Sequence, residues 1–388
     1  MTLTRPETLV DDVTSPEPRV DAEAVVYRLY DVGYEIHLEQ AFQLLASSTP
    51  ERPRPVRGEA QAIQIPNPPV TVGLGVETVR LAGESREVEL SARLFDFGVV
   101  SLRARLVATP GLAWSEFAAF GAAIGAAPFW GEMFTRVRER LLTRIAPAIE
   151  RPGEAPVFED YVVFRVNRLE DGAAAGAGPR TRLSPDALRD EDVARLLLGE
   201  LRPLSGATRR ELLSQRFSYF EDDLTVLTWN SALVIEPVHE DADIQYVLEF
   251  ANAQLLELRF YDARLDAEIP RIYDRIEEAR RGFHLLGSGF NRLLAVLQTR
   301  VADATELVER VENSLKVTDD VFLARIYSAA LEIFRGRTWR SGIDRKISIL
   351  RETYGMLNAE SQARRSEVLE IIIVALIVIE IVLALWKH

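Results

Sequence analysis

The sequence contains no cysteine, and among its 388 residues there are four histidines and three lysines. Without cysteine the chain can form no disulfide, no thiolate zinc site and no cysteine nucleophile. The histidines (His37, His239, His284 and His388) are widely separated, and no pair has the HExxH spacing or another metal-ligand spacing. We therefore expect a protein without a cofactor that is not an enzyme.

Positive charge is scarce in the first two thirds of the chain. The net charge is −13, and residues 1–250 hold 26 arginines against 39 acidic residues. Such an acidic part argues against nucleic-acid binding. Basic residues do gather between 335 and 351, with Trp339 among them, and could contact RNA or anionic lipid. Pairing with the acidic part of the chain is the favoured interpretation of this basic stretch.

Residues 1–21 are polar, rich in proline and acids, and without an apolar core, so we expect a disordered leader. Residues 22–241 mix β-branched alternating stretches with amphipathic ones, which indicates an α+β domain. Strands are expected over 24–38, 87–108 (with a bend at Gly98), 157–166 and on either side of Asn230. Helices are expected over 38–46, 114–124, 129–150 and in 190–215.

Three short stretches of this part of the chain have structural rather than catalytic interpretations. The stretch GAAAGAGP (172–179) lacks the Lys-Ser or Lys-Thr of a phosphate-binding loop, so it predicts a flexible linker. The acids around His239 are expected to cap a helix through Asp241 or Asp243. Glu221, Asp222 and Asp223 are expected in a solvated turn.

Helical periodicity dominates residues 242–366. Apolar residues recur at helical spacing from 244 to 286, a break is expected at Gly287-Ser288-Gly289, and a second periodic run follows over 290–315. A third run starts near Asp319 and continues to the C-terminus. These runs predict a long helical hairpin or coiled-coil stalk.

The last residues, 367–388, are almost wholly apolar, with twelve Ile, Leu or Val residues between 371 and 385. A helix over 368–386 would be about 28 Å long, close to the ~30 Å thickness of a bilayer core. Arg364 and Arg365 precede it, and Trp386 and Lys387 follow it. The sequence thus predicts a single-pass tail anchor in the inner (cytoplasmic) membrane, with the bulk of the chain in the cytoplasm.

Glu380 interrupts this apolar stretch. An ionisable residue in such a place is a functional hypothesis by default. One helix offers it no partner, so a polar contact with another copy of the helix is favoured over an ion or proton path and over a tolerated neutral acid. Glu380 therefore predicts a homo-oligomer.

The C-terminal stretch ILRETYGMLNAESQARRSEVLEIIIVALIVIEIVLAL resembles the end of the required-for-meiotic-nuclear-division proteins, also called the YagE or Sif family. FDFGVVSL (95–102) is similar to a glycine-containing strand of that family. The resemblance implies an oligomeric protein anchored in an inner membrane and transfers only Glu380. It implies no catalytic residue.

The function that these observations favour is a tail-anchored, oligomeric scaffold or tether that binds the lipid bilayer and an unknown cytoplasmic protein partner. One alternative is an ion-conducting assembly with the layout of the CorA magnesium channels, which Tyr354-Gly355-Met356 echoes, although Leu357 replaces their asparagine. A second alternative is a metal-dependent enzyme that would use Asp222 and Asp223.

Overall fold

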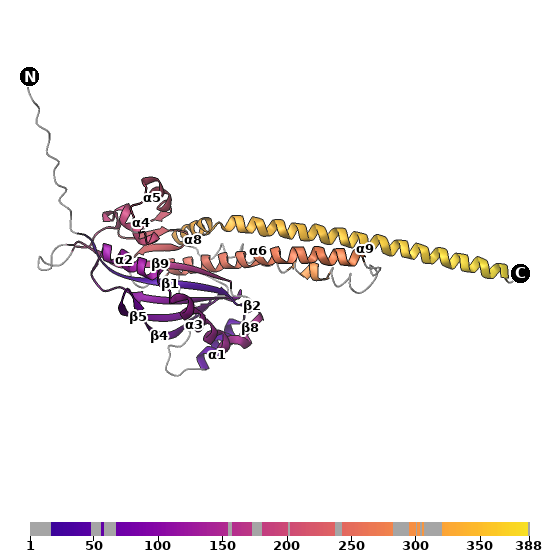
Figure 1. Ribbon diagram of the computed structural model, residues 1–388, viewed down its shortest axis with the longest axis horizontal. Coiled ribbons are helices and arrows are strands. Elements are labelled where there is room, and N and C mark those ends of the chain that lie inside the picture. Colours follow the sequence, from indigo (N-terminus) through magenta and orange to yellow (C-terminus); the bar gives the residue numbers. More distant parts are fainter. Residues whose placement is uncertain are drawn as a thin grey trace, which may run out of the picture. The chain divides into compact units, whose positions relative to one another are not determined.

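The computed structural model describes residues 17–47, 56–57, 67–153, 157–172, 181–200, 202–236, 243–281, 295–299, 301–302, 305 and 320–386. The chain divides into two compact units. Unit 1 comprises Met1–Leu256 and Val317–Phe334, and unit 2 comprises Glu257–Lys316 and Arg335–His388. Unit 1 contains a large sheet with helices around it, and the described part of unit 2 is helical (Figure 1).

A ten-stranded mixed sheet forms the centre of unit 1 among the described residues. Its strands are β1 (Arg19–Asp31), β3 (Val56–Arg57), β4 (Val70–Leu81), β5 (Glu84–Leu94), β6 (Val99–Val107), β7 (Leu112–Ala113), β9 (Phe158–Glu170), β10 (Arg216–Phe217), β11 (Leu224–Leu227) and β12 (Ser231–Ile235). The order is β10-β11-β12-β9-β1-β6-β5-β4-β3, with β7 paired to β1. β12 runs parallel to β9, whereas β1 is antiparallel to both of its long neighbours. A second, two-stranded sheet pairs β2 (Gly33–Ile36) with β8 (Ile149–Pro152).

Helices surround this sheet and form most of unit 2. They are α1 (Leu38–Ser47), α2 (Trp114–Gly125), α3 (Trp130–Ile145), α4 (Asp190–Leu198), α5 (Gly206–Leu212), α6 (Asp243–Arg281), α8 (Val321–Ile333) and α9 (Gly336–Trp386). The continuous helix α6 contributes its first residues, to Leu256, to unit 1 and the rest to unit 2. Helix α9 belongs to unit 2.

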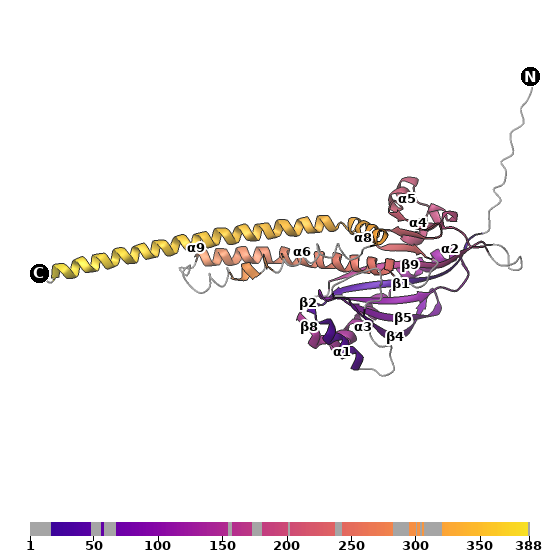
Figure 2. The same ribbon diagram turned by 180° about the vertical axis from the view of Figure 1, so that it is seen from behind.

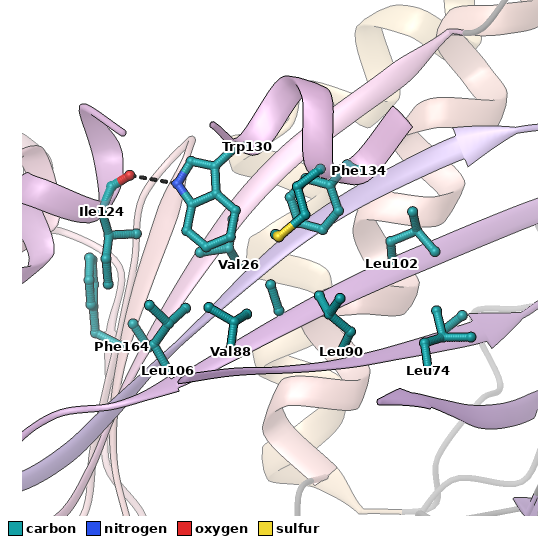
Figure 3. Close-up of a cluster of buried hydrophobic side chains, with 14 of the residues drawn as sticks. Val26, Leu74, Val88, Leu90, Leu102, Leu106, Ile124, Trp130, Phe134 and Phe164 are labelled. Atoms are coloured by element: carbon teal, nitrogen blue, oxygen red, sulfur yellow. Dashed lines mark hydrogen bonds between the residues drawn. The ribbon is translucent and has the colours of Figure 1, made fainter. Parts of the chain in front are cut away.

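One face of the large sheet carries the main hydrophobic core of unit 1. Because side chains alternate between the faces of a strand, Ala22, Ala24 and Val26 of β1 point to the same side. Figure 3 shows Trp130 and Phe134 of α3 packed over the sheet residues of this core, and the Trp130 indole donates a hydrogen bond to the Ile124 carbonyl (2.8 Å). The core therefore joins α2 and α3 to the sheet.

The opposite face of the sheet is covered by the start of α6 and by α8. Tyr27 of β1 donates a hydrogen bond to Gln245 of α6 (3.4 Å), and Phe334, which follows α8, packs against Tyr161 of β9. Figure 2 shows α8 beside the strands of unit 1 from behind. The described residues of α6 from 246 to 256 are all buried. Unit 1 is thus a three-layer arrangement with the sheet in the middle.

In unit 2, α6 and α9 share a second hydrophobic cluster. Its buried residues are Leu258, Tyr261, Leu265, Ile272, Ile276, Leu297, Ile343, Ile347, Leu350 and Leu357. Lys346 of α9 lies 2.7 Å from carboxylate oxygens of both Asp262 and Asp266 of α6. At this lysine, the basic stretch 335–351 pairs with acids of α6 in unit 2.

Many of the local elements expected from the sequence are confirmed. The helices over 38–46, 114–124 and 129–150 correspond to α1, α2 and α3, and the strands around Asn230 are β11 and β12. Gly98 lies in the turn between β5 and β6, as expected, with a φ of 90°. The break at 287–289 and the stretch 173–179 of the linker lie outside the described residues.

The fold class expected from the sequence requires two corrections. First, no helix in the described part of the chain is long and apolar enough to cross a membrane. Glu380 divides the apolar stretch and leaves nine uninterrupted apolar residues before it, or about 14 Å of helix against a bilayer core of ~30 Å. The prediction of a transmembrane tail anchor and of a single-pass protein in the inner membrane is corrected accordingly.

Second, the described residues contain no long coiled-coil stalk. The start of α6 and all of α8 pack within unit 1, although the sequence placed them in a stalk. The cluster between α6 and α9 ends at Leu357, and the large apolar side chains that the structure describes beyond it are exposed. The observed architecture is a large mixed-sheet domain with helices in the C-terminal part.

Candidate functional site

The residues singled out from the sequence lie on or beyond the last part of α9. Glu380 is exposed, and Trp386 is 90% exposed. Arg364 and Arg365 lie within α9, but their side chains, like Lys387, are outside the described part of the structure. The assignment of the four flanking residues to a membrane boundary rested on the span that the structure does not support.

Residues 369–386, the C-terminal segment of α9, expose apolar side chains on every side. The large apolar residues that the structure describes in this segment are 49% to 90% exposed. Ile371, Ile372, Ile373 and Val374 follow one another and are all exposed, although successive residues of a helix point about 100° apart. A helix that is apolar all round is normally covered by other chains or by the rest of its own protein. This segment is the first candidate for a functional surface.

The acidic residues considered for metal binding do not converge. In the described residues, no group of three or more His, Asp or Glu could hold a metal ion. Asp223 accepts hydrogen bonds from the backbone N–H groups of Tyr219 (2.8 Å) and Phe220 (3.0 Å), and Asp222 lies 3.8 Å from Arg182. The expected turn is thus an ordered loop that Asp223 closes. His239 and Asp241 lie outside the described residues, and α6 begins at Asp243.

A charged layer lies between the start of α6 and the sheet of unit 1, and sequence reasoning missed it. Arg93 of β5 is 2% exposed and forms an ion pair with Glu249 of α6, which is also 2% exposed. The Arg93 guanidinium donates a further hydrogen bond to Thr71 (3.3 Å) and stacks over the Tyr246 ring, 4.5 Å from its centroid. A buried ion pair with several hydrogen bonds fixes one geometry rather than contributing large net stability.

The charged layer continues along neighbouring strands towards solvent. Arg105 of β6 contacts Glu23 of β1 (2.6 Å) and Glu89 of β5 (3.0 Å), and Arg165 of β9 lies 3.7 Å from Glu23. Arg103 lies 4.0 Å from Glu249 and joins the two parts of the layer. The sequence signal for this layer was the placement of arginines at alternate positions in otherwise apolar strands.

Tyr27 and the arginines beside it keep their protons near neutral pH. Burial raises the pKa of the Tyr27 hydroxyl far above its ordinary value, and the carboxylate of Glu249 raises it further. Tyr27 therefore stays protonated, and arginine does not lose its proton in proteins. These groups can position α6 on the sheet and hold it in register.

Residues 218–223, the aromatic loop, form a second candidate surface in unit 1. The loop connects β10 with β11 and carries Tyr219 and Phe220, whose exposed fractions are 67% and 64%. The two rings pack perpendicular to each other with centroids 4.8 Å apart, and Tyr219 also lies 5.5 Å from Phe322 of α8. Two neighbouring exposed aromatic rings are typical of protein interaction sites.

These observations describe a mixed-sheet domain followed by long helices, with two candidate surfaces for binding. A family model described as "Uncharacterized protein MJ0711, N-terminal domain" matches residues 21–242, more than half of the chain. The chain belongs to this family. It is 25% identical to Uncharacterized protein MJ0711 of Methanocaldococcus jannaschii over 259 residues, which cover 66% of this chain and 74% of the relative. No solved structure matches the chain.

The family match corrects the resemblance to the required-for-meiotic-nuclear-division proteins, to which none of the comparisons points. That resemblance rested mainly on the apolar C-terminal helix, where Ile, Leu and Val repeat and carry little family-specific information. The match that identifies the family lies over the sheet domain, at residues 21–242. The resemblance was therefore wrong.

Proposed function

We propose that the protein is a non-enzymatic scaffold whose copies associate through the C-terminal segment of α9 (residues 369–386) and hold a partner protein on the sheet domain. The observation that carries this proposal is the exposure of apolar side chains on all sides of that segment. Fully burying one Leu or Ile side chain contributes about 1.5 to 3 kcal/mol. The partner proposed for the segment is a second copy of the same segment.

The spacing of the apolar residues supports a bundle of copies. Six residues fall at alternating intervals of three and four and form one stripe along the helix. They are Leu369, Ile372, Leu376, Ile379, Leu383 and Trp386. Glu370 lies outside this stripe, and Glu380 lies directly at its edge, where a carboxylate can still reach water. Neither acid of the segment therefore lies within the stripe itself.

The residue types in the stripe favour more than two copies. Leucine occupies the first position of each repeat and isoleucine or tryptophan the fourth, and leucine followed by isoleucine in this pattern favours trimers or tetramers over dimers. Association also has to offset roughly 4 to 15 kcal/mol of lost translational and rotational freedom. A bundle of four helices buries more of each segment than a pair does. We therefore propose a tetramer.

The mass of the full-length protein, measured by light scattering and sedimentation across a range of concentrations, tests this proposal. The wild type should be a tetramer that dissociates on dilution. Ile379→Glu places a charge inside the stripe and should give monomers. Val378→Glu is the matched control, because Val378 is exposed to nearly the same extent (53% against 54%) but points away from the stripe.

Three outcomes would contradict the proposal. A wild type that is monomeric at every concentration would show that the segment does not bring copies together. Equal behaviour of the Ile379→Glu and Val378→Glu variants, or a wild type of undefined mass, would show that association does not use this stripe.

A further inference from the structure

The aromatic loop of unit 1 (residues 218–223) combines two features, exposed rings and adjacent carboxylates. Tyr219 and Phe220 are the most exposed aromatic residues in the described part of unit 1. Glu221, Asp222 and Asp223 follow them directly in the chain. The surface therefore offers both π faces and negative charge within a few residues.

The conformation of the loop is fixed before any partner binds. Both carboxylate oxygens of Asp223 accept backbone hydrogen bonds, from Tyr219 and from Phe220. The Ser218 hydroxyl donates to the Phe220 carbonyl (2.6 Å), and Phe322 of α8 supports the Tyr219 ring. A rigid surface loses less conformational entropy on binding, which favours recognition by this loop.

The charges identify the kind of partner. The carboxylate of Asp223 accepts hydrogen bonds within the loop, and the carboxylate of Asp222 lies 3.8 Å from Arg182. The carboxylate of Glu221 is exposed and forms no ion pair among the described residues. Guanidinium groups stack on aromatic faces and pair with carboxylates, and they do both better than ammonium groups. The acids would repel nucleic acid and anionic lipid.

We propose that the aromatic loop is the docking site for an arginine-rich segment of a partner protein. The arginines stack on Tyr219 and Phe220 and pair with Glu221. The inference goes beyond self-association, because it concerns unit 1 and a different kind of partner. It does not require the C-terminal segment of α9 to associate.

Fluorescence anisotropy with the full-length protein and a fluorescein-labelled peptide, GRGRGRGRG, tests the inference. The acidic first part of the chain will attract any polycation, so the decisive variants change the rings and leave the net charge alone. Tyr219→Ala combined with Phe220→Ala should weaken binding roughly tenfold, since each exposed ring contributes a modest cation–π attraction. Tyr273→Ala is the matched control, because Tyr273 is an exposed ring (49%) on α6 in unit 2 and should leave the affinity unchanged.

Further measurements separate specific from general attraction. Glu221→Gln should weaken binding by a few fold, and the acidic peptide GEGEGEGEG should not bind. Both rings of the loop are exposed, so the double variant should keep the melting temperature of the wild type. If it binds the basic peptide as tightly as the wild type, or loses no more affinity than Tyr273→Ala, the inference is overturned. The Ile379→Glu variant should bind the basic peptide as tightly as the wild type does. Loss of self-association and loss of peptide binding can therefore be told apart.

Discussion

Arg93 and Glu249 are 156 residues apart in the sequence and form an ion pair that is almost completely removed from water. The pair joins β5 of the large sheet to the second turn of α6. Removing water from two charges costs several kcal/mol per ion, and only their mutual attraction and further hydrogen bonds offset this cost. One partner left alone is therefore strongly unfavourable.

Replacing Arg93 with Met should lower the free energy of unfolding of unit 1 by about 3 to 5 kcal/mol, because Glu249 would stay buried without its nearest cation, and Arg103 at 4.0 Å is too distant to replace that ion pair. The double variant Arg93→Met with Glu249→Leu should recover most of the loss. Denaturant titration followed by circular dichroism measures both. The control is Arg136→Met, which breaks an exposed ion pair with Glu77 and should cost at most about 1 kcal/mol. Equal losses for Arg93→Met and Arg136→Met would show that burial of the pair has no energetic effect.

Tyr27 should make unit 1 less stable in alkali. Burial and the charge of Glu249 raise its pKa in the folded protein, so above the ordinary value of 10.0 the unfolded chain loses this proton while the folded protein keeps it. The folded state then binds more protons, and stability falls as the pH rises, by about 1.4 kcal/mol per pH unit for one such group. Below pH 10 this contribution is fully present.

The Tyr27→Phe variant should show a shallower loss of stability between pH 10 and 11.5 than the wild type, in denaturant titrations at each pH. Near neutral pH it should be slightly less stable, since the hydrogen bond to Gln245 is lost. Tyr273→Phe, in which the removed hydroxyl belongs to an exposed side chain, should keep the wild-type slope. A Tyr27→Phe slope as steep as that of the wild type would contradict the raised pKa.

Local elements could be predicted from the sequence, whereas the assignment of α6 and the charged layer could not. Periodicity placed α1, α2 and α3 correctly because each buries one face against the same core. It also indicated a helix from 242, but the same apolar spacing suits a stalk and a helix buried in a domain. The sequence gives no sign that Glu249 and Arg93 are partners, because only the packing of α6 against β5 brings them together. Sequence reasoning therefore placed the start of α6 outside the domain to which it belongs.

The two candidate surfaces also differ in how much of each could be predicted from the sequence. The apolar C-terminal segment was evident from composition, but composition alone led to a membrane span. The aromatic loop was read as a solvated turn, since its acids were considered without the rings before them. Its interpretation as a binding surface depends on the exposed fractions of Tyr219 and Phe220 and on the hydrogen bonds of Asp223. Secondary-structure propensities of the residues predict neither of these.

Gly98 should tolerate no side chain. Its φ is 90°, and an added Cβ would lie 1.9 Å from the carbonyl oxygen of Gly33 in β2. Gly98→Ala should therefore destabilise unit 1 by well over 2 kcal/mol, through backbone strain together with displacement of β2. Gly83→Ala is a sharp control, because Gly83 has a similar φ of 87° but nothing within 4 Å of the added atom, so only the strain of about 1 to 2 kcal/mol remains. Thermal melting of the two variants separates the steric part from the conformational part, and equal losses would contradict the close approach of Gly33.

Glu380 should limit the strength of association between copies. It lies at the edge of the proposed stripe, beside Ile379, and in a bundle its carboxylate approaches those of the other copies. Glu380→Gln removes this repulsion and should tighten the tetramer by a few fold. Glu380→Leu should tighten it further, by roughly tenfold or more, since burial of a leucine contributes about 1.5 to 3 kcal/mol. It should also yield more than one oligomeric species, because a polar residue that restricts the register has been lost. Sedimentation of the full-length variants measures both effects. If the leucine variant instead dissociates more readily than the wild type, Glu380 forms a polar contact between copies, as the sequence alone indicated, and the register of the stripe must be reassigned.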